Sequence, residues 1–270
     1  MFRDGVIFSG PERHGPYLQA MSKVDPTLDA AHPRPERPLI AIGDLHGCAD
    51  KLEAMLDAVA AELSRLGVAD ADLVTLGDYV DRGENSRGVI EALRKVQADF
   101  PGFLTCLMGN HESMMLDFLD RPEERGGRFL RYGGLQTLAS FGVGGVTERS
   151  RADDLVRASE DLRAAMPDGT EDWLRTLSLW TQSGDVVCVH AGMDPVVPPA
   201  MQERRPMLWG HPFFYKAPRP DGLWVVHGHD VVDAPTIKER RVSCDTGAYF
   251  TSRLTAAVVL PEEPVRFLTV

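Results

Sequence analysis

Three short polar strings contain the residue types in this chain that are best suited to chemistry. They are G-D-L-H-G at Gly43–Gly47, G-D-Y-V-D-R-G at Gly77–Gly83 and G-N-H-E at Gly109–Glu112. Each string follows an apolar run of the kind that forms a buried strand. Carboxylate and amide oxygens together with imidazole nitrogens are typical ligands of divalent metal ions. The sequence therefore predicts a metal site built at the ends of three strands.

The same strings, with two later histidine motifs, supply ligands for two metal ions. The candidates are Asp44, His46, Asp78, Asn110, His190 and one histidine of the H-G-H string, His227 or His229. Asp44 and His46 are separated by one residue, so in extended chain both side chains point the same way and can reach one cation. Asp78 could bridge two cations. Mixed oxygen and imidazole ligation favours manganese, with iron or zinc as alternatives, over calcium or magnesium.

Such a site predicts phosphoryl transfer. Two cations about 3.5–4 Å apart acidify a shared water, and the hydroxide then attacks phosphorus in line with the leaving oxygen. His111, next to Asn110, is placed to protonate the leaving group, and Asp81 could orient the ring of His111. Arg82 offers a fork of donors for the phosphoryl oxygens. A single buried Asp or His is more often a satisfied core group, but this many at strand ends would be costly without a shared ligand.

Composition excludes several other classes of protein. The 270 residues contain 29 Lys plus Arg and 40 Asp plus Glu, a formal charge of −11, which disfavours general nucleic-acid binding. No apolar run approaches the roughly 20 residues of a membrane span, and no secretory signal pattern begins the chain. The four cysteines form no C-x-x-C pair, so a structural zinc site is not expected. We expect a reduced, cytoplasmic protein without membrane partners.

The elements around the strings alternate between strand and helix. Apolar runs at 39–42, 73–76 and 103–108 predict strands, and helical spacing at 52–66 and 89–100 predicts two helices between them. Gly67 suits the end of the first helix, and Ser86 is expected to cap the second. This order predicts a parallel sheet with right-handed crossovers, whose ligands bind beyond the carboxyl ends of the strands.

The remaining segments are less regular. Residues 120–182 are predicted to form a helical insertion, whose arginines either bind an anionic substrate or cover a solvated face. Strands at 185–190, 223–227, 241–245 and 254–260 have few helices between them and predict a second, more antiparallel sheet. Residues 1–38, which contain H-P-R-P-E-R-P, are interpreted as an arm or linker in which Val6–Phe8 could add an edge strand.

At these motifs the chain resembles the phosphoprotein phosphatase family of metallophosphoesterases, over most of residues 39–260. The resemblance implies an α/β fold with two mixed sheets packed as a sandwich, flanked by helices, within a domain spanning 39–270. It implies Asp44, His46 and Asp78 on one metal, and Asp78, Asn110, His190 and His229 on the other. It also implies His111 as the acid with Asp81 as its partner, and Arg82 as a phosphate-binding residue. A second phosphate arginine is expected after the H-A-G motif, where Arg205 is preferred over Arg204.

Two enzymatic functions compete. The favoured one is a protein serine/threonine phosphatase acting on a phosphorylated protein or peptide, with phosphotyrosine as an additional candidate substrate. The alternative is a symmetrical diadenosine tetraphosphate hydrolase. Enzymes of that type resemble this chain but typically have Ala in place of Asp81, so the intact V-D-R-G favours a phosphomonoester with a poorer leaving group. A catalytically silent binding module would lack a metal ligand, and none is missing.

Overall fold

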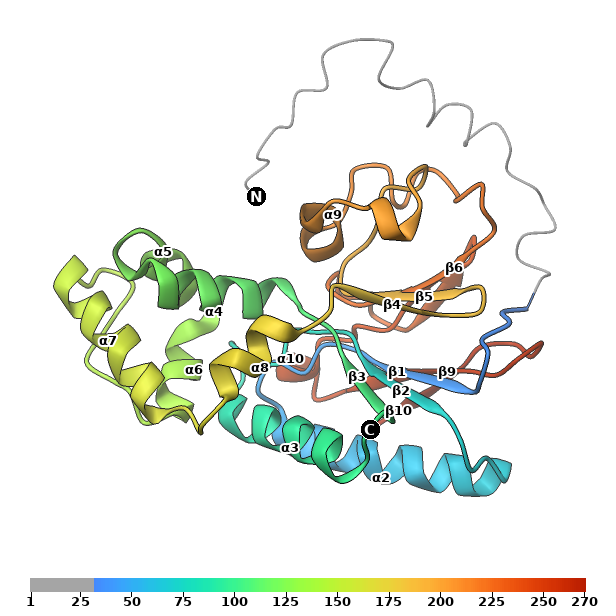
Figure 1. The fold of residues 1–270 in the computed structure, drawn as a ribbon, viewed down its shortest axis with the longest axis horizontal. Coiled ribbons are helices and arrows are strands. Elements are labelled where there is room, and N and C mark those ends of the chain that lie inside the picture. The colour runs from blue at the N-terminus through green and yellow to red at the C-terminus, as the bar shows by residue number, and fades with distance from the viewer. Residues whose placement is uncertain (1–31) are drawn as a thin grey trace, which may run out of the picture.

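The computed structural model describes residues 32–270. Two five-stranded sheets pack face to face, and helices lie against the outer side of one of them (Figure 1). This architecture confirms the predicted α/β sandwich of two mixed sheets flanked by helices. Most of the predicted N-terminal arm, including the strand suggested at Val6–Phe8, lies outside the described residues.

The first sheet has the strand order β10-β9-β1-β2-β3. Its strands are β1 (Leu39–Ile42), β2 (Asp72–Thr75), β3 (Leu104–Cys106), β9 (Thr255–Val259) and β10 (Arg266–Thr269). β1, β2 and β3 are parallel, as the alternating order of strands and helices predicts. β9 runs antiparallel to both β1 and β10. The run at 254–260 was expected in the second sheet, and that expectation is wrong.

The second sheet has the strand order β4-β5-β6-β8-β7. Its strands are β4 (Trp180–Ser183), β5 (Val186–Val189), β6 (Trp224–His227), β7 (Thr236–Lys238) and β8 (Arg241–Ser243). The three central strands are parallel, and only the edge pairs β4–β5 and β7–β8 are antiparallel. The predicted antiparallel character is therefore wrong for the centre. Between β5 and β6 the return path is loop, the short η4 (Pro199–Met201) and α9 (Arg204–Trp209), so the parallel connection needs no long helix.

Side-chain alternation along the strands builds the layers. Leu39 and Ala41 face the second sheet, whereas Ile40 and Ile42 face the helices. The core between the sheets is completed by Val74, Leu76, Val186, Cys188, Val226, Val242 and Ala257. Because every one of these residues is buried, the two sheets hold their strand ends in fixed relation to one another.

Helices α2 (Ala49–Leu66) and α3 (Ser86–Asp99) cover the outer face of the first sheet (Figure 1). α2 ends at Gly67 in the left-handed conformation, as predicted. The cap of α3 is Asn85 rather than Ser86, since the Asn85 side chain accepts a hydrogen bond from the amide of Gly88 at 2.9 Å. Ser86 is instead buried, and its hydroxyl accepts a hydrogen bond from the amide of Asp81 at 3.2 Å.

A group of helices projects to one side of the sandwich (Figure 1). It comprises α4 (Asn110–Asp120), α5 (Pro122–Phe129), η3 (Leu130–Gly134), α6 (Leu135–Ser140), α7 (Ala152–Ala165) and α8 (Thr170–Thr176), followed after a short loop by β4. Its hydrophobic contacts continue the core beneath the first sheet. The short helix α10 (Ala248–Thr251) precedes β9.

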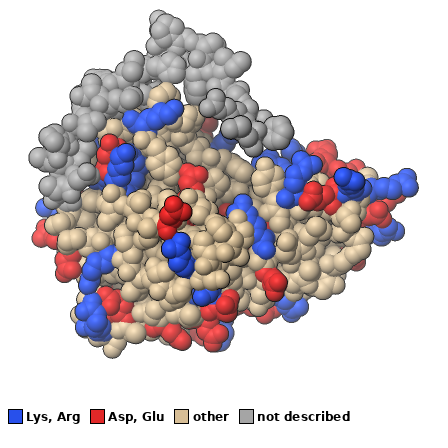
Figure 2. All heavy atoms as spheres, turned by 180° about the vertical axis from the view of Figure 1, so that it is seen from behind, with Lys and Arg blue, Asp and Glu red and all other residues tan. Residues whose placement is uncertain are grey.

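Acidic and basic side chains are interspersed on the face shown in Figure 2, without a continuous basic patch among the residues described there. Within residues 32–270, no helix combines the length and the apolar character needed to cross a bilayer.

Candidate metal centre

The loops that follow β1 and β2 bind each other through their backbones. The amides of Leu45 and His46 donate to the carbonyl of Asp78 at 3.1 and 2.7 Å, and the amide of Gly47 donates to Tyr79 at 2.9 Å. Because β1 and β2 are parallel neighbours, their carboxyl ends meet at one edge of the sheet. The three polar strings are thereby brought into one site.

Several site residues have backbone angles that are unusual for residues with a side chain. The φ values are 40° at His46, 53° at Asp78, 71° at Asp81, 69° at Arg82 and 65° at His229. Each such residue costs on the order of 1 kcal/mol or more, and such strain clusters at functional sites. The surrounding hydrogen bonds hold these side chains where they converge.

Glu112 fastens two of the loops together, a role that the sequence analysis did not assign to it. Its buried carboxylate accepts hydrogen bonds from the amides of Asp78 (2.8 Å), Tyr79 (2.7 Å), Val80 (3.2 Å) and Gly109 (2.9 Å). Burial and the neighbouring Asp78 raise the pKa of Glu112 to about 7, while these amides favour its ionised form. Its position three residues into α4, as in a capping box, is the sequence signal that could have revealed this role.

One group of candidate ligands joins Asp78 to the second sheet. Asp78, His190 and His229 offer ligand atoms that all lie within 4.8 Å of one another. The Oδ1 atom of Asn110 lies 2.8 Å from Nε2 of His190 and 2.9 Å from Nδ1 of His229. Asp44 accepts a hydrogen bond from the amide of His229 at 3.1 Å and lies 3.9 Å from His190.

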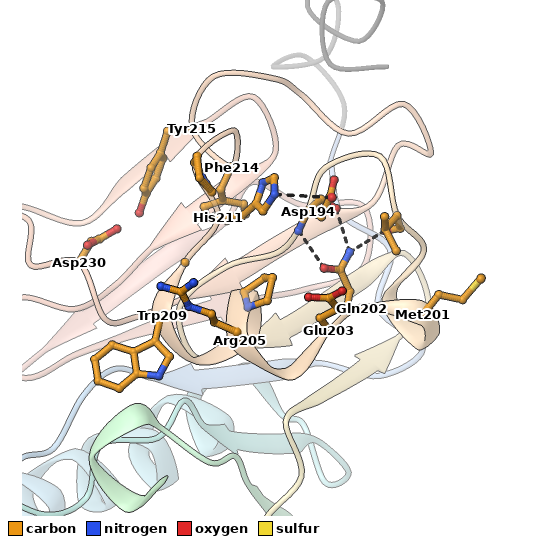
Figure 3. A pocket seen from close by; sticks show the side chains of 14 residues that line it. Asp194, Met201, Gln202, Glu203, Arg205, Trp209, His211, Phe214, Tyr215 and Asp230 are labelled. Carbon is orange, nitrogen blue, oxygen red and sulfur yellow. Dashed lines mark hydrogen bonds and ion pairs between the residues drawn. The ribbon is translucent and has the colours of Figure 1, made fainter. Parts of the chain in front are cut away.

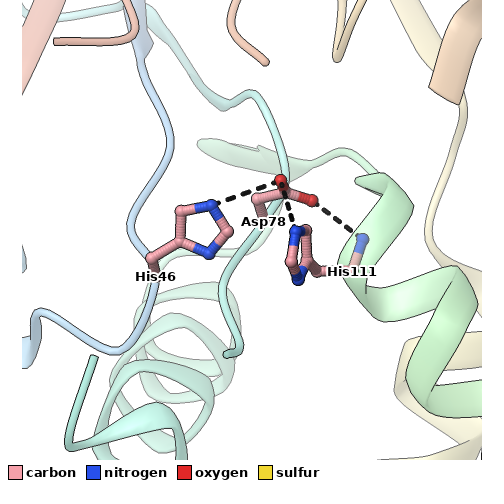
Figure 4. A group of neighbouring side chains, drawn as sticks. All are labelled: His46, Asp78 and His111. Atoms are coloured by element: carbon pink, nitrogen blue, oxygen red, sulfur yellow. Dashed lines mark hydrogen bonds and ion pairs between the residues drawn. The ribbon is translucent and has the colours of Figure 1, made fainter. Parts of the chain in front are cut away.

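The other group lies on the opposite side of Asp78. His46, Asp78 and His111 also place ligand atoms within 4.8 Å of one another. Both imidazole rings point toward the Asp78 carboxylate, at 3.5 Å for His46 and 3.9 Å for His111 (Figure 4). All six predicted metal ligands therefore lie together, with Asp78 shared between the groups. His227, the rejected histidine of H-G-H, is instead buried against Ser243 at 2.9 Å.

Burial favours the neutral form of His46 and His190, the form that binds metals. The Nδ1 atoms of His46 and His190 donate to the carbonyls of Val80 (2.8 Å) and Leu76 (2.9 Å), so in the neutral ring each Nε2 carries no proton and can act as a metal ligand. Burial lowers the pKa of His46 to about 3 and that of His190 to about 4, so both are neutral at pH 7. Burial opposes ionisation of Asp78, but the surrounding histidines hold its pKa below the usual range. This donor set fits two cations.

His111 differs from these ligands in its partners. Its Nδ1 lies 2.6 Å from Oδ2 of Asp81, and its buried Nε2 has no hydrogen-bond partner among the described residues. Burial alone would lower the pKa of His111, but Asp78 and Asp81 raise it above its ordinary value. Thr137 donates to the other oxygen of Asp81 at 2.7 Å. Thr137 lies in the helical insertion, and no local pattern in the sequence indicates this contact.

Aromatic and guanidinium groups surround the ligands. The guanidinium of Arg82 lies over the ring of Tyr249, with Cζ 5.0 Å from the ring centroid. The Tyr249 ring in turn contacts the His46 ring edge-on, with 5.2 Å between the two centroids. Arg82 also approaches Nε2 of His46 at 3.2 Å. On the other side Arg128 lies 4.7 Å over the indole of Trp209. Arg128 is one of the insertion arginines considered for anion binding in the sequence analysis, whereas Trp209 and Tyr249 were not identified as site residues from the sequence.

The second predicted phosphate arginine, Arg205, lies on α9. Arg205 is exposed on α9 and lines a pocket of about 830 Å³ together with Trp209 and Asp230. The guanidinium of Arg204 contacts the sulfur of Met108, just before the G-N-H-E string.

Residues 37–254 match the model of the calcineurin-like phosphoesterases. The chain belongs to the calcineurin-like phosphoesterase family. This phosphoesterase is 27% identical over 234 residues to the asymmetrical bis(5'-nucleosyl)-tetraphosphatase PrpE of Bacillus velezensis, a match covering 79% of this chain and 86% of that protein. It is 31% identical over 159 residues to the symmetrical bis(5'-nucleosyl)-tetraphosphatase of Pseudomonas fluorescens, covering 57% of this chain and 43% of that protein.

The fold of this phosphoesterase is also similar to that of a protein serine/threonine phosphatase from Saccharomyces cerevisiae, with a TM-score of 0.54 and 14% identity, covering 96% of this chain and 90% of the other.

Proposed function

We propose that this phosphoesterase hydrolyses the polyphosphate chain of a dinucleoside polyphosphate. The observation that carries the proposal is the set of aromatic rings around the metal ligands. Three aromatic rings contact histidines of the site edge-on. The distances between ring centroids are 6.2 Å for Trp209 and His229, 6.5 Å for Tyr132 and His111, and 5.2 Å for Tyr249 and His46. Tyr132 and Tyr249 are 44% and 37% exposed, so part of each ring can be reached by a nucleobase, although Arg128 and Arg82 each lie over one of these rings. The similarity to two bis(5'-nucleosyl)-tetraphosphatases supports the same substrate class.

The metal ions would be held by the six ligands already described. As the family resemblance implies, Asp44, His46 and Asp78 would bind one ion, and Asp78, Asn110, His190 and His229 would bind the other. The structure groups His46 with Asp78, and Asp78 with His190 and His229, and it places Asp44 beside His190 and His229. When bound, such a pair supplies a nucleophile at neutral pH and offsets charge on the phosphoryl oxygens. We propose manganese as the first metal to test, with iron and zinc as alternatives.

The remaining site residues position the substrate and handle protons. Arg82 stacks on the ring of Tyr249, and its guanidinium reaches the site at His46. It would bind phosphoryl oxygens there. His111 would protonate the leaving oxygen through Nε2, while Asp81 holds the opposite nitrogen and so fixes the ring. Thr137 in turn fixes Asp81.

A second candidate function is hydrolysis of phosphomonoesters, including phosphorylated serine or threonine in proteins. The observation that favours it is the intact His111–Asp81 pair at 2.6 Å. A serine or threonine alkoxide is a poor leaving group and needs a proton, whereas a polyphosphate leaves with less help. The arrangement of acid and partner therefore keeps the phosphoprotein phosphatase hypothesis as the competing proposal.

The test compares both substrate classes on the same preparation. Metal-stripped protein is reloaded with Mn²⁺, Fe²⁺ or Zn²⁺ and given diadenosine tetraphosphate, a phosphoserine peptide or a phosphotyrosine peptide. Chromatography separates two ADP, the symmetrical outcome, from ATP plus AMP, the asymmetrical one. We expect metal-dependent cleavage of the dinucleotide. Fast release of phosphate from peptides with little nucleotide cleavage would contradict the proposal and establish the second candidate.

A further inference from the structure

A pocket of about 830 Å³ opens beside the metal centre, between α9 and the segments that precede and follow it. Its volume lies within the range of about 300–1,000 Å³ that is usual for small-molecule sites. Figure 3 shows Trp209, Arg205 and Tyr215 along one side of this pocket, with Gln202 and Asp194 at the other end. We call it the α9 pocket. None of the residues assigned above to metal binding, proton transfer or phosphate binding by Arg82 lines this pocket.

The α9 pocket shares a wall with the metal site. Trp209, which lines the pocket, meets the candidate metal ligand His229 at 6.2 Å. Asp230, which also lines the pocket, directly follows His229 in the chain. The pocket and the candidate metal site are therefore direct neighbours, joined at Trp209 and Asp230.

The chemistry of the lining suits a neutral group better than a phosphate. Three carboxylates line the pocket, those of Asp194, Glu203 and Asp230, against the single guanidinium of Arg205. Away from Arg205, a phosphate group would be repelled by this excess of negative charge. Carboxylates accept hydrogen bonds from hydroxyl and amino groups, which ribose and adenine both carry.

The aromatic content of the α9 pocket points to a flat ligand. Trp209, Phe214 and Tyr215 all line it, and the ring of Tyr215 is 47% exposed. Phe214 and His227 pack against Tyr215 at 5.0 and 5.7 Å, which holds the tyrosine ring in place. A positioned and accessible ring offers a face on which a base can stack.

We propose that the α9 pocket binds the nucleoside end of the substrate, with the base against Tyr215. This inference rests on the proposed function, since it assigns a subsite for one nucleoside of a dinucleoside polyphosphate. Arg205, at the side of the pocket nearest Trp209, binds the phosphate that joins this nucleoside to the chain. The subsite places a nucleoside beside the metals and leaves the remaining phosphates to Arg82 and Arg128.

The test measures binding rather than turnover, so that it can be separated from the test of the proposed function. Calorimetry on Mn²⁺-loaded protein compares the phosphonate analogues of AMP and of ribose 5-phosphate, which cannot be hydrolysed. The two ligands share the phosphonate and the ribose and differ only in the base. We expect the AMP analogue to bind about tenfold more tightly. Equal affinity for the two ligands would overturn the subsite, even if diadenosine tetraphosphate proves to be a substrate.

Variants at Tyr215 place the effect in the pocket. Tyr215→Ala should remove the advantage of the AMP analogue and leave the ribose 5-phosphate analogue unchanged, which also shows that the variant remains folded. Tyr215→Phe, which keeps the ring, should retain the advantage, as should Phe100→Ala, an exposed aromatic that lines a different pocket. An advantage that persists in Tyr215→Ala would overturn the proposal. A second outcome would also overturn it. This is a peptide with a phosphoserine between lysines that binds more tightly than the AMP analogue and that loses affinity in Tyr215→Ala.

Discussion

His111 is held so that one of its ring nitrogens is reserved for chemistry. Nδ1 of His111 is hydrogen-bonded to Oδ2 of Asp81 at 2.6 Å. The hydroxyl of Thr137 donates to Oδ1 of Asp81 at 2.7 Å. The remaining Nε2 is buried, has no partner among residues 32–270 and lies 3.9 Å from Asp78. An unpaired nitrogen at this depth is costly unless a ligand satisfies it, so the geometry favours a role with substrate present.

Replacing His111 separates the two candidate functions. His111→Asn should lower turnover of a phosphoserine peptide by about 10²–10⁴-fold, because the alkoxide leaving group loses its proton donor. Turnover of diadenosine tetraphosphate should fall far less. The measurement is kcat on both substrates with the same Mn²⁺-loaded preparation. Equal losses on the two substrates would argue against His111 as the acid.

Asp78 is the residue shared by both groups of candidate ligands. Asp78→Asn should abolish metal-dependent turnover and reduce bound metal, because the shared site loses its negative charge. The circular dichroism spectrum should be unchanged, since the amide keeps the size of the side chain. Metal content by mass spectrometry and phosphate release are the readouts, with the exposed Asp57→Asn as the matched control. A fully active variant would show that Asp78 does not bridge the metals.

At the scale of elements, the start of α4 is fastened to the loop after β2. The carboxylate of Glu112 accepts hydrogen bonds from four backbone amides of these two segments. Glu112→Gln removes acceptor capacity and charge from a buried cluster, which should cost about 2–3 kcal/mol in the free energy of unfolding. The affinity for Mn²⁺ should fall by about 10–100-fold. Urea denaturation and Mn²⁺ titration test both effects, and unchanged metal affinity would limit Glu112 to a role in stability.

An ion-pair network joins α4 to α8. Arg175 binds Asp120 at 3.1 Å and Glu171 at 2.7 Å, and Arg163 binds Glu171 at 3.0 Å. The hydrogen bond to Arg175 lowers the pKa of Asp120. Burial opposes ionisation of Glu171, but hydrogen bonds from Arg175 and Arg163 hold its pKa below the usual value.

This network predicts a pH-dependent contribution to stability. Because both carboxyl pKa values are lowered by folding, the stabilisation is present above their unfolded values, about 4, and is lost as the pH falls through the folded values. Arg175→Gln should therefore lower the melting temperature at pH 7, and its effect should disappear once the pH falls below the folded pKa values of Asp120 and Glu171. The side chains are partly exposed, so we expect less than about 1 kcal/mol. Arg87→Gln, from an exposed pair on one helix, is the control. An effect independent of pH would point to packing instead.

At the scale of the whole molecule, the site lies where the two sheets meet. Asp44 follows a strand of the first sheet, whereas Gly228 and His229 follow a strand of the second. A Cβ atom added at Gly228 would lie 2.1 Å from Oδ1 of Asp44, so only glycine allows the two loops to approach this closely.

Gly228→Ala should therefore weaken metal binding more than folding. We expect at least a tenfold loss of activity at limiting Mn²⁺, partly recovered with excess Mn²⁺, and only a small change in the melting temperature. The control is Gly127→Ala, where an added Cβ meets nothing within 4 Å. A large fall in melting temperature with unchanged metal dependence would mean that Gly228 serves packing between the sheets.

The sequence by itself determined the three parallel strands of the first sheet, the polar strings at their ends and the membership of the metallophosphoesterases, because hydrophobic periodicity and strand-end motifs are local properties. Only the tertiary structure decided that the run at 254–260 pairs with β1, that the centre of the second sheet is parallel and that Thr137 meets Asp81. It also decided that Arg205 lines the α9 pocket. The physical reason is that the alternation of apolar and polar residues along a strand shows which of its faces is buried, but not which strand lies beside it. The backbone groups of a strand can form hydrogen bonds with any neighbouring strand. The choice of partner depends on packing between residues distant in the chain.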